Sequence, residues 1–213
     1  MAVGVKICGL REPPALDAAV RHGARMVGFV FFDRSPRNVS LDEVAALARH
    51  VPEGIERVGV TVDAGDDRLG AVIAAAELDI VQFHGSEDVR RLDQVRTRFG
   101  VRVMKVIRVA TAEDLESLRS FDAVADMVMF DAMPPREATR PGGNAATFDW
   151  TLLAGIRPRS PWILSGGLDA GNLHRAVEVS GATTVDVSSG VETSPGHKSA
   201  SRIAEFMEQA RVI

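Results

Sequence analysis

The sequence predicts a (β/α)₈ TIM barrel from the order, number and length of its repeating units. Short runs of β-branched residues alternate with longer stretches of helical period that are rich in Ala, Leu, Glu and Arg. Eight such units fill 213 residues, and eight units close this barrel. Strands that are buried on both faces and separated by helices pair in parallel. A doubly wound open sheet is the alternative, but it usually has fewer strands and, for nucleotides, a Gly-x-Gly-x-x-Gly turn.

The first four units each combine an apolar run, a turn signal and a helical stretch. Gly23 and Gly100 are placed to end the first and fourth helices, and Ser40 is placed to cap the second. The expected strands cover residues 3–8, 26–31, 57–62 and 80–83, and the expected helices cover residues 14–22, 41–50, 67–76 and 87–98.

The last four units follow the same pattern with one long interruption. Gly181 is placed to end the seventh helix. The loop 132–147 holds three prolines and two glycines, and a long loop after a barrel strand lies on the catalytic face. The expected strands cover residues 102–107, 127–130, 162–164 and 184–187, and the expected helices cover residues 112–120, 150–154, 172–179 and 200–210.

Composition bounds the class of protein. Hydrophobic residues make up 46% and charged residues 25% of the chain, which is typical of one folded domain, here residues 1–213. A net charge of −4 argues against nucleic-acid binding. One cysteine makes no internal disulfide and holds no zinc ion by itself. Because no signal peptide and no apolar run of membrane length is apparent, we expect no membrane association and a cytoplasmic setting.

Ionisable side chains gather where the predicted strands end. In a TIM barrel these carboxyl ends form the catalytic face. Seven of the eight ends carry such a side chain, and the seventh strand instead ends in a Ser-Gly-Gly turn. The side chains at the strand ends include Lys6, Cys8, Arg37, Asp63, His84, Lys105, Arg108, Asp131 and Asp186.

Lys6 and Cys8 are two residues apart, so both face the barrel interior from the first strand. A lysine beside a thiol favours the reactive thiolate, and we expect Lys6 to lower the pKa of Cys8. The competing interpretation is that a lone cysteine is a small buried hydrophobe. Position alone does not separate the two.

Asp131 directly follows an apolar strand and precedes the long loop. Partial burial of a carboxyl group raises its proton affinity, as acid catalysis at neutral pH requires. The competing interpretation is a helix cap or an acceptor that orders the loop. Similarly, Arg37 suits a carboxylate or phosphate but could be a solvated loop residue, and His84 could be structural.

Two glycine turns follow the seventh and eighth strands. Gly166 and Gly167 lie in the first, and Ser189 and Gly190 lie in the second. Glycine lets the backbone approach an anion, and the loops after these two strands form the phosphate site of many TIM barrels. The alternative is a pair of ordinary tight turns.

Six motifs in this chain together resemble one enzyme family over residues 3–207. They are Lys6-Ile7-Cys8-Gly9, Gly28-Phe29-Val30-Phe31 with Ser35-Pro36-Arg37, Gln82-Phe83-His84-Gly85, Phe148-Asp149-Trp150, Ser165-Gly166-Gly167-Leu168, and the run from Val185 to Glu192. Their types and order resemble those of phosphoribosylanthranilate isomerase, an enzyme of tryptophan biosynthesis.

The resemblance implies a TIM barrel that performs an Amadori rearrangement of N-(5-phosphoribosyl)anthranilate without cofactor or metal. The product is 1-(2-carboxyphenylamino)-1-deoxyribulose 5-phosphate. By resemblance, Cys8 is the general base, Asp131 the general acid and Arg37 the residue that meets the anthranilate carboxylate. The turns at Gly166–Gly167 and Ser189–Gly190 resemble the phosphate cradle. We also expect Lys6, His84 and Asp186 to contact the substrate. Both a monomer and a homodimer are compatible with the family.

The chain departs from the family pattern at three positions. Ala145 replaces a glycine of the loop before Phe148, so a backbone shape with positive φ is expected to be lost there. Ser199 replaces a common aspartate at a helix cap, and Ser165 replaces a common alanine. The altered loop keeps open a paralogue that rearranges a different N-glycoside.

Two further alternatives differ in class. A barrel that only binds a phosphorylated metabolite has no need of an acid–base pair, so Cys8 and Asp131 argue against it. An isomerase that also serves histidine biosynthesis carries acidic residues, rather than Lys-Ile-Cys-Gly, at the end of its first strand.

Overall fold

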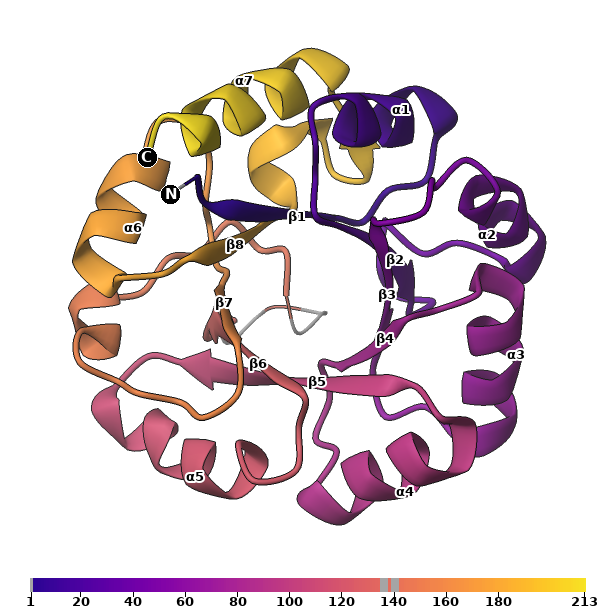
Figure 1. The fold of residues 1–213 in the computed structure, drawn as a ribbon, viewed down its shortest axis with the longest axis horizontal. Helices are drawn as coiled ribbons and strands as arrows, with labels where there is room; N and C mark the ends of the chain where they lie inside the picture. Colours follow the sequence, from indigo (N-terminus) through magenta and orange to yellow (C-terminus); the bar gives the residue numbers. More distant parts are fainter. Residues whose placement is uncertain (1, 135–137, 139–141) are drawn as a thin grey trace.

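The computed structural model describes residues 2–134, 138 and 142–213. Its eight main strands form one closed parallel barrel in chain order, which confirms the predicted fold class (Figure 1). The strands are β1 (Gly4–Cys8), β2 (Met26–Phe31), β3 (Glu56–Thr61), β4 (Ile80–Phe83), β5 (Arg102–Val109), β6 (Met127–Ala132), β7 (Trp162–Leu164) and β8 (Thr184–Val187). Within the described part of the chain, no helix is both long and apolar enough to cross a membrane.

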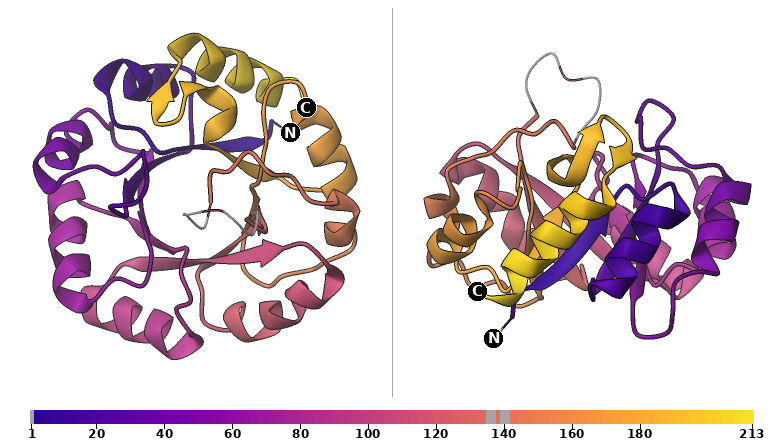
Figure 2. Two further views of the ribbon diagram at one scale, coloured as in Figure 1. Left: turned by 180° about the vertical axis from the view of Figure 1, so that it is seen from behind. Right: turned by 90° about the horizontal axis from the view of Figure 1, so that it is seen from above.

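Helices surround the barrel on its outside (Figures 1 and 2). They are α1 (Pro13–Arg21), α2 (Leu41–Ala48), α3 (Asp66–Ala76), α4 (Val89–Phe99), α5 (Leu118–Phe121), α6 (Leu173–Ser180) and α7 (Ala200–Arg211). The predicted helix signals are present: Ser40 forms a capping box with Glu43, and Gly100 and Gly181 end α4 and α6 with positive φ.

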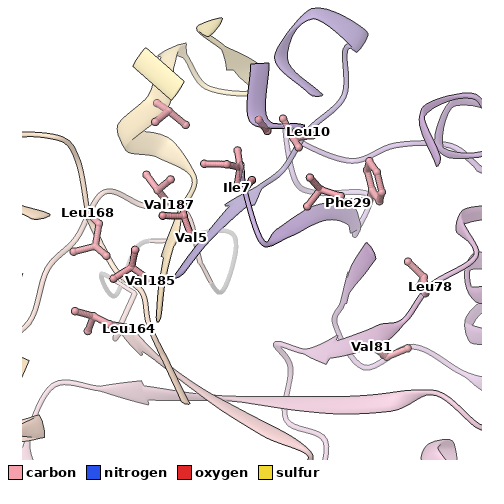
Figure 3. Packing of buried hydrophobic residues seen from close by; sticks show 14 of the residues in the cluster. Val5, Ile7, Leu10, Phe29, Leu78, Val81, Leu164, Leu168, Val185 and Val187 are labelled. Atoms are coloured by element: carbon pink, nitrogen blue, oxygen red, sulfur yellow. The ribbon is translucent and has the colours of Figure 1, made fainter. Parts of the chain in front are cut away.

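Alternation along each strand creates two apolar layers. Val5, Ile7 and Phe29 point outward and pack under the helices, as Figure 3 shows together with Val185 and Val187. The opposite faces fill the barrel interior with a separate cluster. Its members are Met26, Val58, Ile80, Met104, Val106, Met127, Met129 and Ile163. The barrel interior below the site is therefore filled by apolar side chains. Above this layer the inward-facing residues are polar on β4, β6 and β8 (Gln82, Asp131 and Asp186), whereas β2 and β3 present Val30 and Val60.

The structure differs from the predicted elements in four main places. Residues 112–120 divide into a 3₁₀ turn, η1 (Ala112–Ser117), and the short helix α5, and residues 150–154 form only the 3₁₀ turn η2 (Trp150–Leu153). Strand β6 continues through Ala132, so Asp131 lies within the strand rather than after it. After β8, the 3₁₀ turn η3 (Ser189–Val191) leads into a hairpin that the sequence analysis did not predict.

That hairpin consists of β9 (Glu192–Ser194) and β10 (His197–Lys198), paired antiparallel. It lies at the opposite end of the barrel from the two chain termini (Figure 2, right). Gly196 makes the tight turn possible, since its φ is +87°. The hairpin therefore brings residues from the end of the chain to the catalytic face.

Candidate active site

A pocket opens at the carboxyl ends of the barrel strands. Its apolar wall consists of Val30, Phe32, Val60, Val62 and Leu168. Its polar side chains are Cys8, Ser35, Arg37, Gln82, His84, Asn144, Asp131, Ser165, Asp186, Ser188 and Ser189. The predicted thiol, carboxylates and arginine therefore share one pocket, because the inward-facing positions of several strands converge there.

Cys8 lies at the end of β1, beside Gly28 of β2. Lys6, two residues earlier, is wholly buried, and its Nζ donates to Asp186 Oδ1 at 2.7 Å. Lys6 and Asp186 are register partners in β1 and β8. A Cβ on Gly28 would lie 3.1 Å from both Cys8 Sγ and Lys6 Nζ. The thiol and the ammonium group therefore share the space that this glycine leaves open.

Burial and the charge of Lys6 shift the pKa of the Cys8 thiol in opposite directions. Burial raises the pKa of the Cys8 thiol above its ordinary value, and the positive charge of Lys6 offsets only part of that effect. Lys6 thus lowers the pKa of Cys8 as expected, but burial outweighs this effect and the net shift is upward. Burial alone would lower the pKa of Lys6, but Asp186 and Cys8 together raise it, so the lysine stays charged. Ser165 Oγ donates to the second Asp186 oxygen at 3.1 Å.

Asp131 faces the pocket from β6, in line with Met127 and Met129 below it. Its Oδ1 accepts from the backbone N–H of Ala132 at 2.9 Å, and its Oδ2 lies 3.2 Å from His84 Nε2. Gly142 packs against this pair, since a Cβ there would lie 3.0 Å from Asp131 Oδ2 and collide with the His84 ring. The long loop therefore covers the carboxyl group directly.

Arg37 is only 4% exposed although it follows β2 in a loop. Its Nε and Nη2 donate to the two carboxylate oxygens of Glu192 at 2.7 and 2.8 Å. Its Nη2 also lies 3.3 Å from the carbonyl oxygen of Gly143, to which it donates. The Glu192 carboxylate accepts a further bond from Lys198 Nζ at 2.7 Å. The arginine is therefore fixed by a buried bidentate ion pair rather than solvated.

The charges of Arg37, Glu192 and Lys198 stabilise one another. Burial alone would raise the pKa of Glu192, but hydrogen bonds from Arg37 and the charge of Lys198 outweigh burial and lower it. Burial lowers the pKa of Lys198, and Glu192 opposes that shift. Lys198 also donates to the carbonyl oxygen and hydroxyl of Ser188, at 2.9 and 3.1 Å. The hairpin is thus tied to the end of β8.

The two glycine turns lie side by side at the ends of β7 and β8. Gly166 and Gly167 have φ of +95° and +62°, which only glycine adopts without strain. A Cβ on Gly190 would collide with the carbonyl oxygen of Leu168, so this glycine lets the two turns pack together. Ser189 and both glycines of the first turn line the pocket. This arrangement presents backbone at one end of the pocket, where an anion fits.

The loop before Phe148, which departs from the family pattern, still has a positive φ at residue 145. Ala145 has a φ of +56°, in the left-handed region, so the expectation that a positive φ is lost there is wrong. The neighbouring residues Gly142 to Ala146 line the pocket. The left-handed conformation of Ala145 therefore costs conformational energy that a glycine would avoid.

Some predicted polar positions lie away from the pocket chemistry. Lys105 pairs with Glu87 at 3.1 Å and lies 5.4 Å from the centre of the Phe121 ring. Glu87 in turn accepts from the backbone N–H groups of Asp63 and Gly85. These groups stabilise the turns after β3 and β4. Sequence reasoning gave no role to Glu192, the last residue of the sixth motif, and missed Lys198, whose only signal is its position after the second glycine turn.

Comparison with known proteins agrees with this geometry. Residues 5–209 match the family model described as N-(5′-phosphoribosyl)anthranilate (PRA) isomerase. The chain is 50% identical over 210 residues to the N-(5′-phosphoribosyl)anthranilate isomerase of Paracoccus denitrificans, covering 99% of this chain and 98% of that protein. It is 49% identical over 214 residues to the Rhodospirillum centenum protein of the same name, covering all of both chains.

Solved structures show the same fold. The phosphoribosylanthranilate isomerase of Thermotoga maritima superposes with a TM-score of 0.88 at 32% identity, covering 99% of this chain and 100% of that one. A phosphoribosylanthranilate isomerase in complex with reduced 1-(o-carboxyphenylamino)-1-deoxyribulose 5-phosphate superposes with a TM-score of 0.86 at 31% identity, with the same coverage. Sequence, fold and pocket agree over nearly the whole length, and the chain belongs to the N-(5′-phosphoribosyl)anthranilate isomerase family.

Proposed function

We propose that this chain catalyses the Amadori rearrangement of N-(5′-phosphoribosyl)anthranilate to 1-(2-carboxyphenylamino)-1-deoxyribulose 5-phosphate, by general acid–base catalysis. One observation carries the proposal: Cys8 and Asp131 face a single pocket from β1 and β6, and the two glycine turns end the strands β7 and β8 between them. A substrate whose phosphate occupies these turns has its ribose between the thiol and the carboxyl group.

The reaction needs one proton donated and one removed. Asp131 donates a proton to the furanose ring oxygen, the C1–O bond breaks, and the anomeric carbon becomes a Schiff base with the anthranilate nitrogen. Cys8 then removes the proton from C2, and the electron pair of that bond forms the enolamine. Protonation at C1 and loss of the proton of the 2-hydroxyl group then give the aminoketose. Each positioned acid or base contributes roughly 10²- to 10⁴-fold to the rate.

The residues behind the two reactive groups have positioning roles in this proposal. The charged Lys6 stabilises the thiolate of Cys8, and Asp186 keeps Lys6 in place at 2.7 Å. His84 lies 3.2 Å from Asp131 and restricts the orientation of its carboxyl group. Contacts of Lys6, His84 and Asp186 with the substrate itself stay predictions, and the full burial of Lys6 favours an indirect role for it.

The two ends of the substrate meet different chemistry. The phosphate suits the backbone at Gly166, Gly167 and Ser189. Gly190 allows the two turns that carry these residues to approach each other. The apolar wall that includes Phe32 and Val60 suits the aromatic ring, and Arg37 suits the carboxylate on that ring. A monomer or homodimer and a cytoplasmic setting stay predictions, and light scattering after size exclusion checks the oligomeric state.

The proposed function is tested with phosphoribosylanthranilate generated in the cuvette. Its fluorescence should decay on addition of the wild-type protein, and mass spectrometry after borohydride reduction should identify the aminoketose as its product. The control reaction contains heat-inactivated protein, because the substrate also decomposes without enzyme. The wild-type protein is shown to be folded by circular dichroism. If the folded protein does not turn over the substrate, the proposal is contradicted, and rearrangement of a different N-glycoside becomes the favoured function.

A further inference from the structure

Glu192 is a buried carboxylate that the acid–base chemistry does not use. It begins the hairpin β9–β10, and only 6% of its surface is exposed. Its position in the sequence, two residues after the glycine of the second turn, gives no reason for burial. A buried carboxylate is costly unless it is paired and hydrogen-bonded. The contacts of Glu192 therefore indicate what it does.

Those contacts define the orientation of Arg37. The Nε and Nη2 edge of the guanidinium lies on the Glu192 carboxylate, at 2.7 and 2.8 Å. The Nη1 side then faces Gly143, where a Cβ would collide with it. Both Arg37 and Gly143 line the pocket. Because a guanidinium is planar and rigid, fixing one edge fixes the direction of the others.

Lys198 fixes Glu192 in turn. Its Nζ binds Glu192 Oε1 at 2.7 Å and also donates to both oxygens of Ser188, which lies next to the phosphate turn. Two cations and one carboxylate leave this buried group with a net charge of +1. Of these three charged side chains Arg37 lines the pocket, so a substrate anion meets the guanidinium in the orientation that Glu192 sets.

We infer that Glu192 is a positioning residue that fixes the guanidinium of Arg37 for the carboxylate of the substrate, and that the pair sets the preference for a carboxylated aromatic amine. This inference rests on the proposed function. It assigns to the hairpin β9–β10 a role in specificity, through contacts 155 residues apart in the sequence.

The test compares two ligands that differ only in the carboxylate. One is reduced 1-(o-carboxyphenylamino)-1-deoxyribulose 5-phosphate, and the other is the same compound with an unsubstituted phenyl ring. Titration calorimetry gives the ratio of their dissociation constants for wild-type protein and for Glu192→Gln, in which a neutral amide of the same shape replaces the carboxylate. We expect the wild-type preference for the carboxylated ligand to fall about tenfold or more in the variant.

Two further readouts separate positioning from a general loss of structure. The affinity for the phenyl ligand should change less than about threefold, since its phosphate and ring contacts remain. In turnover of phosphoribosylanthranilate, the KM should rise by about tenfold while kcat at saturation stays within a few-fold of wild type. Arg37→Ala should weaken binding of the same carboxylated ligand and serves as the reference for complete loss of the preference.

Glu87→Gln is the matched control. Glu87 is also a buried carboxylate with a lysine partner, Lys105 at 3.1 Å, but it lies after β4, away from Arg37. This variant should keep the wild-type ligand preference. If Glu192→Gln does not fold, Glu192→Asp replaces it in the test. The aspartate keeps the charge but withdraws the carboxylate from Arg37, so this variant should also lose the preference for the carboxylated ligand.

The outcomes are distinct. A preference within about twofold of wild type in a folded Glu192 variant overturns the inference, as does an equal loss of affinity for both ligands. If the wild-type protein itself shows no preference for the carboxylate, the assignment of Arg37 in the proposed function fails instead.

Discussion

On the β1–β8 side of the pocket, Cys8 lies against a closed ion pair, whereas on the β6 side Asp131 is held by one backbone N–H, by His84 and by the loop at Gly142. The surroundings of the thiol belong to barrel strands in register, so the barrel itself fixes them. The surroundings of the carboxyl group depend in part on a long loop. Cys8 is therefore positioned by the sheet alone, whereas Asp131 is also positioned by a loop segment that packs on it.

The largest expected effects come from removing the two reactive groups themselves. Cys8→Ala and Asp131→Asn should each lower kcat by roughly 10²- to 10⁴-fold, because each removes one proton-transfer group. The affinity for the reduced product and the melting temperature should stay close to wild type, since neither residue belongs to the phosphate turns and Asp131→Asn keeps the shape of the side chain. Steady-state fluorescence assays, calorimetry and thermal unfolding measure the three quantities. Full activity of Cys8→Ala would exclude the thiol as the base.

A smaller effect is expected when the ion pair behind Cys8 is removed. The thiolate is the reactive form, and burial holds the pKa of Cys8 above its ordinary value of 9.0, so alkylation of Cys8 should still accelerate at pH 9.0. Replacing Lys6 removes a charge that favours the thiolate, so the pKa of Cys8 should rise further. Measured rates of iodoacetamide alkylation against pH test both statements.

The variant for this experiment needs its own control. Lys6→Met alone leaves Asp186 buried without its lysine, which costs about 3–5 kcal/mol of folding free energy. The double variant Lys6→Met/Asp186→Asn removes both charges and should fold more stably. Because Asp186 raises the pKa of Cys8 and Lys6 lowers it more, the double variant should show a smaller upward shift. An alkylation profile unchanged from wild type in both variants would contradict the role of Lys6.

The next smaller effect is expected at Gly28, where a side chain would press on Cys8 and Lys6 but not on Asp131. A Cβ there would lie 3.1 Å from Cys8 Sγ and Lys6 Nζ, so Gly28→Ala should displace one of them. Overpacking of this kind costs about 1–3 kcal/mol, and we expect kcat/KM to fall by about tenfold. Gly65→Ala, at an open helix start with ordinary φ, is the control and should keep wild-type kcat/KM. Equal activity of the two variants would show that the thiol tolerates displacement.

The smallest effect is expected from a substitution at Ala145, in the loop that packs on Asp131. Ala145 at a φ of +56° pays a strain of about 1–2 kcal/mol that glycine avoids, partly offset by the greater freedom of glycine. Ala145→Gly should therefore bind the reduced product a few-fold more tightly, as calorimetry can measure. Ala146→Gly, the neighbouring residue outside the left-handed region, should bind it no more tightly than wild type. Weaker binding by Ala145→Gly would contradict the strain argument.

The barrel and the inward-facing site residues could be predicted from the sequence because strand alternation is a local property. Four strands, β2, β4, β7 and β8, have the predicted bounds, and Cys8, Asp131 and Asp186 lie at the pocket as inward positions of their strands. The remaining differences in strand bounds are small, since strand ends depend on hydrogen bonds to neighbours.

Other parts of the site depend on contacts that no local pattern encodes. Arg37 and Glu192 meet across 155 residues, so their pairing follows only from closure of the barrel. The sign of the pKa shift at Cys8 depends on the balance of burial and charge, which sequence spacing does not give. At Ala145, the surrounding loop holds a conformation that the residue type disfavours.

The division of labour between Cys8 and Asp131 is tested most directly with phosphoribosylanthranilate that carries deuterium at C2 of the ribose. Single-turnover rates for Cys8→Ser and Asp131→Asn are compared with labelled and unlabelled substrate. We expect a primary isotope effect in Cys8→Ser, because a weaker base makes C2–H cleavage limiting, and little or none in Asp131→Asn, because ring opening precedes that step. An isotope effect in Asp131→Asn together with none in Cys8→Ser would contradict the assignment of acid and base.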